Sequence, residues 1–204
     1  GVMETLRSAT QHGSFLVTRL DMLSGWDGIV SRRMDSIFLS DEQLNAVAEA
    51  LGEDAAYAPL YFAVVPELSA FGSGFFSYMM NADQLQALGT MFFTFSEGDW
   101  ETALPILRAG CGVLVAPLIT NRHRVSLGDT LPVTGLNGTV NCTIAGIGTS
   151  AANTSIISDT LRHELVRDNP VMLFVVPRAG IASEALQARL EGPIQAHPPL
   201  AVLR

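Results

Sequence analysis

Two charged segments of this chain come nearest to the spacing that metal binding or catalysis needs. The first begins with His163 and Glu164, as the two-histidine zinc motif of metalloproteases does. Arg167 stands where the second histidine would have to be, so two ligands cannot share one helical face. We therefore predict a solvent-exposed helix face here and no zinc site.

The second segment places three carboxylates, Glu97, Asp99 and Glu101, close together. A calcium site or an acid–base pair could be built from them. The alternative is the start of a helix, where acidic side chains interact favourably with the positive end of the helix dipole. We favour the helix start, because Asp99 and Glu101 would fall in its first turn.

Three glycine-containing segments resemble parts of known catalytic or cofactor loops. Gly110-Cys111-Gly112 precedes a predicted strand instead of following one, and Gly146-Ile147-Gly148 lacks the third glycine of a dinucleotide loop. Gly72-Ser73-Gly74 lacks the surroundings of a nucleophile elbow. No nucleophile, base and oxyanion-stabilising donors occur as a set. We predict that the chain is not an enzyme and binds no cofactor and no metal.

The composition excludes further classes of protein. The 204 residues include no lysine, which rules out P-loop nucleotide hydrolysis and Schiff-base chemistry. Twenty carboxylates against twelve arginines, a formal charge of −8, argue against a nucleic-acid partner. Hydrophobic residues make up 48% of the chain, yet no apolar run approaches the ~20 residues that span a bilayer.

The two cysteines, Cys111 and Cys142, each lie inside a predicted strand. Two buried free thiols are the interpretation we favour, because free cysteine is among the most buried residue types. A disulfide stays open as the alternative if the two strands pair in an oxidising compartment.

The two ends of the chain predict similar units. Residues 15–23 alternate as a half-buried strand, Ser40 and Gln43 begin a helix as a reciprocal cap, and residues 57–65 form a second strand. Near the other end, strands at 171–177 and 200–203 flank a helix at 181–195, which Pro193 should kink or shorten.

The middle of the chain has a different pattern. The last two of its predicted strands form a hairpin around Asn137-Gly138. Pro105 should kink or interrupt the helix that contains it. The fold class is therefore α+β, with one subdomain built from two strand–helix–strand units at the chain ends and a mixed α/β insertion forming the other. The predicted strands are 75–80, 91–95, 112–116, 130–134 and 139–147, and the helices are 82–88, 98–108 and a turn at 121–124.

Residues 93–147 carry a series of motifs whose order is more specific than any one of them. Glu97-Gly98-Asp99 precedes Ala103-Leu104, then come Val113-Leu114-Val115, the segment from Val125 to Leu131 with Gly128-Asp129 inside it, and Ile144-Ala145-Gly146-Ile147. This series resembles the extracytoplasmic domain of FtsX/MacB-type ABC transporter permeases. Ala116-Pro117-Leu118 departs from the family pattern and alters the start of one short helix.

The resemblance implies a MacB-like ectodomain in two subdomains. Residues 1–66 and 171–204 would form a discontinuous, membrane-proximal, porter-like subdomain, and residues 67–170 an inserted distal one. The implied function is that of a non-catalytic extracytoplasmic domain of an efflux, export or lipoprotein-handling permease in the cell membrane. It would relay the motion of the transmembrane helices of the same permease to a partner or substrate. A cytoplasmic ABC ATPase subunit or domain would drive that motion by hydrolysing ATP.

An aromatic, glycine-containing loop is the candidate for contact with an extracytoplasmic partner or the exported substrate. Its residues are Phe71, Gly72, Gly74, Phe75 and Phe76. Aromatic side chains on a glycine-hinged loop can dock a partner or an apolar cargo. The alternative is that these phenylalanines belong to the core, since Phe is often fully buried. A second functional hypothesis is an extracytoplasmic module that binds a small molecule or a lipid.

Overall fold

The computed structural model describes residues 13–19, 37–69, 76–88, 93–150 and 154–203. These residues divide into two units, each with its own internal contacts. The terminal unit comprises the described residues up to 60 and from 168 onward, and the middle unit comprises residues 61–167. Strand β2 (Ala55–Val64) contributes residues 55–60 to the first and 61–64 to the second.

The terminal unit consists of two interleaved strand–helix–strand segments. Its strand order is β10-β1-β9-β2, with every neighbouring pair antiparallel. The two strands of each segment are therefore parallel and lie either side of a strand from the other segment, which is the split βαβ arrangement. The first segment is β1 (Phe15–Arg19), α4 (Asp41–Leu51) and β2, and the second is β9 (Met172–Pro177), α9 (Ser183–Arg189), α10 (Glu191–Ala196) and β10 (Leu200–Leu203).

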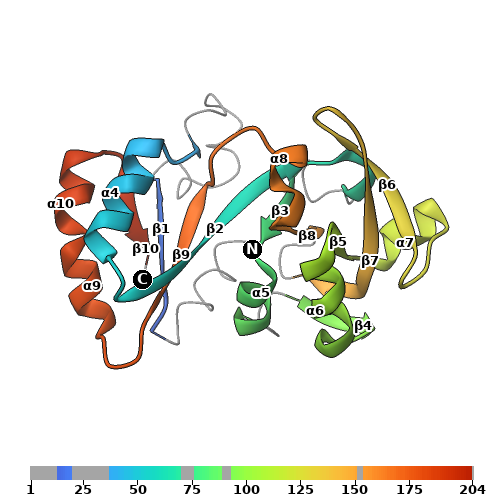
Figure 1. The fold of residues 1–204 in the computed structure, drawn as a ribbon, viewed down its shortest axis with the longest axis horizontal. Helices are drawn as coiled ribbons and strands as arrows, with labels where there is room; N and C mark the ends of the chain where they lie inside the picture. The colour runs from blue at the N-terminus through green and yellow to red at the C-terminus, as the bar shows by residue number, and fades with distance from the viewer. Residues whose placement is uncertain (1–12, 20–36, 70–75, 89–92, 151–153, 204) are drawn as a thin grey trace. The chain divides into compact units, whose positions relative to one another are not determined.

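A hydrophobic core among the described residues helps to hold this unit together. Helices α4, α9 and α10 contact one another, as the blue and red helices of Figure 1 show. Apolar side chains of the helices pack with side chains of β1, β9 and β10, and the central ones, including Val17, Leu51 and Val175, are fully buried. Burial of this kind stabilises a domain by roughly 25 cal/mol per Å² of apolar surface.

The predicted helix signals of the terminal unit are confirmed. The Ser40 hydroxyl accepts from the Gln43 backbone N–H at 3.1 Å, and the Gln43 side chain accepts from the Ser40 N–H at 2.9 Å. The helix predicted at 181–195 is divided at Leu190 into α9 and α10, with Pro193 in the first turn of the second. The strand predicted at 15–23 is confirmed for Phe15–Arg19, and residues 20–23 lie outside the described part of the chain.

The middle unit is a mixed sheet with helices. Its strand order is β2-β3-β8-β5-β7-β4, with β6 paired to β7, and the β3–β8 and β5–β7 pairs are parallel. The strands are β3 (Phe76–Met80), β4 (Phe93–Glu97), β5 (Gly112–Val115), β6 (Thr130–Gly135), β7 (Gly138–Ser150) and β8 (Ile156–Ser158). The helices are α5 (Ala82–Leu88), α6 (Trp100–Ala109), α7 (Pro117–His123) and α8 (Arg162–Leu165), with 3-10 turns η3 (Pro66–Leu68) and η5 (Asp159–Leu161).

Two prolines lie within helices of the middle unit without interrupting them. Helix α6 continues through Pro105, so the predicted interruption does not occur. Pro117 occupies the first position of α7, where its missing N–H costs nothing and its fixed φ suits a helix. The predicted hairpin is confirmed, but Gly135 pairs with Gly138, so the turn residues are Leu136 and Asn137 and the turn lies one residue earlier than predicted. In the described ranges, no helix is long and apolar enough to cross a membrane.

Candidate functional site

The structure tests little of the aromatic contact loop predicted from the sequence. Phe71, Gly72, Gly74 and Phe75 lie outside the described residues. Phe76 is the first residue of β3 and pairs with Val64 of β2. Participation of these residues in partner or substrate contact therefore stays a prediction.

The residues that lead into this loop are held by three side-chain hydrogen bonds. His123 Nε2 donates to the Glu67 carbonyl at 2.7 Å, and Ser155 Oγ donates to the Leu68 carbonyl at 2.6 Å. Arg122 donates through Nη1 to the Ser69 carbonyl at 2.8 Å. Leu68 itself is completely buried. We call residues 66–69 the anchor segment, because side chains of α7 and of Ser155, the residue directly before β8, hold its backbone.

The Glu67 carboxylate adds a fourth attachment, to strand β6. Its Oε1 accepts from the Thr134 backbone N–H at 2.9 Å and from the Thr134 hydroxyl. Partial burial raises the pKa of the carboxyl, but the hydrogen bonds, together with the nearby His123, outweigh burial and leave the pKa below its ordinary value. The charged form is thus the one that the anchor segment stabilises.

We expect the anchor segment to make stability depend on pH in the acid range. A carboxyl whose pKa is lower in the folded state contributes stability above its unfolded pKa, and loses it as the pH falls through the folded pKa. Glu67→Gln should therefore flatten the decrease in Tm between pH 6 and about pH 3. The contribution of Glu67 to the free energy of unfolding is less than about 1 kcal/mol, because its side chain is partly exposed. Thermal unfolding followed by circular dichroism measures this. Equal slopes for the wild type and Glu67→Gln would contradict it, and Thr134→Val should give an intermediate slope.

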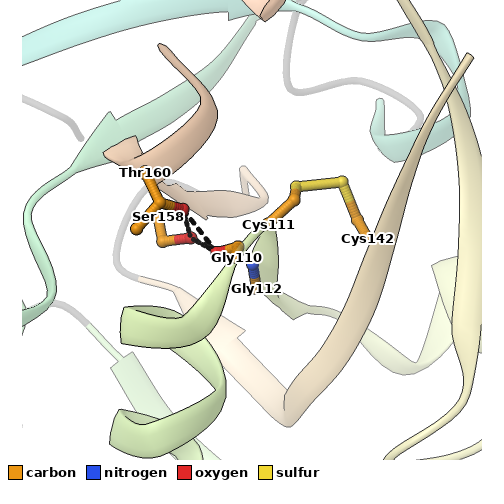
Figure 2. Close-up of a disulfide and its surroundings, with 6 residues drawn as sticks. All are labelled: Gly110, Cys111, Gly112, Cys142, Ser158 and Thr160. Atoms are coloured by element: carbon orange, nitrogen blue, oxygen red, sulfur yellow. Dashed lines mark hydrogen bonds between the residues drawn. A yellow bond between two sulfur atoms is a disulfide. The ribbon is translucent and has the colours of Figure 1, made fainter.

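The two cysteines form a disulfide, so the favoured prediction of two free thiols is wrong. Cys111 directly precedes β5, Cys142 lies in β7, and their Cα atoms are 4.6 Å apart. The parallel pairing of Gly112 with Thr143 brings the two residues together, and the Thr143 N–H donates to the Cys111 carbonyl at 2.8 Å. Figure 2 shows the bridge between the start of β5 and β7.

A single hydroxyl holds the backbone on both sides of Cys111 (Figure 2). Ser158 Oγ donates to the Gly110 carbonyl and accepts from the Gly112 N–H, each at 2.9 Å. The Thr160 hydroxyl donates to the same Gly110 carbonyl. Ser158 is completely buried, so these bonds replace water that its hydroxyl has lost. The position of the disulfide is therefore set by β8 and η5 as well as by the two strands it joins.

The other motifs have structural roles in the described residues. Asp99 caps α6, and its Oδ1 accepts from the Thr102 N–H at 2.8 Å. The side-chain hydrogen bond from Thr102 lowers the pKa of Asp99, as a charged helix cap should. His163 and Glu164 are exposed on α8. In the part of the chain that the structure describes, no three His, Cys, Asp or Glu residues gather as a metal site would require.

The glycines of Gly146-Ile147-Gly148 allow close packing of β4 on β7. A Cβ on Gly148 would lie 2.0 Å from the Thr94 carbonyl oxygen, and one on Gly146 would lie 2.4 Å from the Phe95 ring. Phe95 makes edge-to-face contacts with Phe93 and with Trp100, each with ring centroids 5.0 Å apart. The missing side chains of Gly146 and Gly148 therefore leave room for the backbone of β4 and for the aromatic cluster of Phe93, Phe95 and Trp100.

Reasoning from the sequence did not find the anchor segment or Ser158. Glu67 and Thr134 are 67 residues apart, and Ser158 is 48 residues from Gly110. Neither pair has a spacing that a helix or a hairpin would bring together. The sequence carried no local signal from which these contacts could have been predicted.

Comparison with known proteins rests on the fold. No family model and no curated protein matches the sequence. The periplasmic region of MacB from Actinobacillus actinomycetemcomitans has a similar structure, with a TM-score of 0.54 and 8% identity over 99% of this chain and 91% of the other. The extracellular domain of the noncanonic ABC-type transporter YknZ from Gram-positive bacteria aligns with a TM-score of 0.43 and 9% identity over 94% of this chain and all of the other. The similarity to the first structure confirms the predicted α+β, MacB-like fold over almost the whole chain.

Proposed function

We propose that this chain is a non-catalytic, extracytoplasmic domain of an ABC-type transporter permease. The observation that carries the proposal is the fold shared with the periplasmic region of MacB, which extends over 99% of the chain. The Cys111–Cys142 disulfide supports the same location, because disulfides persist mainly in oxidising compartments outside the cytoplasm. The order of the motifs in residues 93–147 supports the same type of permease.

In this proposal, the domain transmits motion and carries out no chemistry. A cytoplasmic ATPase subunit or domain hydrolyses ATP and moves the transmembrane helices, and the domain passes that motion to the exported substrate or to a partner. The terminal unit is the membrane-proximal part, and the middle unit is the distal part. Well-packed units suit such a relay, because packed cores move as bodies and deform little. The disulfide and the anchor segment add covalent and hydrogen-bonded links inside the middle unit.

The aromatic loop is the contact that we propose for the partner or substrate. The anchor segment supports this idea, since it fixes the backbone just before Phe71. Val64, which pairs with Phe76, is 57% exposed, so an apolar side chain is available beside the end of the loop. Binding of a small molecule or a lipid remains the alternative, and a thermal shift on adding lipid would favour it.

Surface labelling in intact cells tests the extracytoplasmic location. Both native cysteines are in the disulfide, so the wild-type protein sets the background for a thiol reagent. Glu101 is exposed in the first turn of α6, and Glu101→Cys supplies one accessible thiol. A membrane-impermeant maleimide should label Glu101→Cys in intact cells, with any outer membrane permeabilised. Labelling only after lysis would show that the location is wrong.

Deleting residues 71–76 tests the contact role of the loop. We expect loss of transport and of partner binding, with ATP hydrolysis by the reconstituted transporter retained, because ATP is hydrolysed elsewhere. Leu118→Ser is a suitable control, since Leu118 is 48% exposed on α7 and has no part in the proposed contact. Transport and partner binding that survive the deletion would exclude the loop as the contact.

A further inference from the structure

The two cysteines are closed off from solvent in the folded chain. Cys111 is 4% exposed and Cys142 is 0% exposed. Both belong to an apolar cluster of the middle unit, with Val113, Leu131 and Ile144 among its members. We infer that the disulfide forms by exchange with a disulfide-carrying oxidant on the incompletely folded chain, before β6 closes over β7.

The elements around the sulfurs explain why access requires opening. Leu131 of β6 is paired directly with Cys142, is 4% exposed, and lies in the same cluster. Strand β6 pairs with β7 from Thr130 to Gly135. On the other side, Ser158 holds the backbone before and after Cys111. Strand β6 cannot move away from β7 without breaking the hydrogen bonds of that pairing. Strand β5 cannot move without breaking the hydrogen bonds of Ser158 to Gly110 and Gly112.

The exchange reaction needs more room than the folded structure leaves. The thiolate of one cysteine attacks a sulfur of the oxidant, which forms a mixed disulfide and expels one oxidant thiolate. The thiolate of the second cysteine then attacks the chain sulfur of the mixed disulfide, closes Cys111–Cys142 and expels the second oxidant thiolate. Two thiols of the chain are oxidised, one disulfide of the oxidant is reduced to two thiols, and the protons pass to the oxidant or to water. A second molecule must therefore reach a sulfur that is buried in the finished fold.

The reverse reaction tests this order of events on the oxidised protein as it exists. Reduction by dithiothreitol passes through the same kind of mixed disulfide, so it needs the same access. We expect reduction in native buffer to be at least about a thousand-fold slower than in unfolding concentrations of urea, because few molecules are open at any time. Alkylation of the released thiols at timed intervals, followed by mass spectrometry, measures both rates. A native rate within about tenfold of the rate in urea would overturn the inference.

A matched pair of leucine variants identifies the element that must open. Leu131→Ala weakens the cover over Cys142 and should speed native reduction by at least about tenfold. Leu118→Ala, at a leucine that is 48% exposed within the same disulfide loop, should change the rate by less than about twofold. Equal rates for Leu131→Ala and the wild type would exclude opening of β6. The wild-type comparison decides the main point even if Leu131→Ala does not fold, and none of these outcomes depends on the proposed transport function.

Discussion

Replacing Cys111 and Cys142 together with alanine should lower the free energy of unfolding by about 3–4 kcal/mol. The disulfide closes a loop with a sequence separation of 31 residues, and the lost cross-link lets the unfolded chain gain the corresponding entropy. The loop contains β5, α7 and β6, so much of the middle unit is constrained by the bond. Urea titration followed by circular dichroism measures the change.

The single variants provide the decisive control. Cys111→Ala and Cys142→Ala break the same bond, so each alone should lose nearly as much stability as the double variant. Two separate buried thiols would instead give two smaller losses that add up. Additive single losses, or a total below about 1 kcal/mol, would show that the bond contributes little.

Gly148→Ala should destabilise the middle unit by about 3 kcal/mol or more. The added Cβ would meet the Thr94 carbonyl oxygen at 2.0 Å and the Phe95 Cα at 2.9 Å. Both are backbone atoms, so no side-chain rotation relieves the contact and β4 must move away from β7. Movement of β4 would also separate Phe95 from Trp100, whose ring centroids lie 5.0 Å apart. Urea titration gives the loss, and tryptophan fluorescence reports on Trp100 once Trp26, the other tryptophan of the chain, is replaced with phenylalanine in both proteins compared.

Gly192→Ala is the matched control for this substitution. A Cβ at Gly192 has no atom within 4 Å, and the residue lies in α10. Alanine is favoured over glycine in helices by up to about 1 kcal/mol, so Gly192→Ala should leave stability unchanged or raise it. A similar loss for both variants would mean that close packing of β4 on β7 is not the cause.

The parts of the fold that could be predicted depend on residues near one another in the chain. The cap of α4 needs Ser40 and Gln43, and the cap of α6 needs Asp99 and Thr102, each pair three residues apart. The β6–β7 hairpin needs only a tight turn, predicted at Asn137-Gly138 and found at Leu136-Asn137, and the alternation on either side of it. Such signals act locally, so the sequence shows them whatever the rest of the chain does.

The anchor segment could not be predicted, because its partners are distant in the sequence. His123 and Thr134 reach Glu67 only once α7 and β6 have packed beside η3. Their residue types are common on protein surfaces, and nothing in their spacing marks them. The pKa shift of Glu67 follows from the same contacts and is equally invisible in the sequence.

The sequence alone determined the excluded chemistries, the strand–helix–strand units at both ends and the series of motifs typical of the permease ectodomain. Tertiary structure decided which cysteine interpretation holds, because a disulfide needs Cα atoms roughly 4.4–6.8 Å apart, and the pairing of β5 with β7 brings Cys111 and Cys142 to 4.6 Å. Tertiary structure also determined that Gly146 and Gly148 lie where β4 packs so closely that a Cβ would not fit. Local conformation depends on neighbouring residues, whereas these distances depend on which strands pair, and strand pairing is a property of the whole chain.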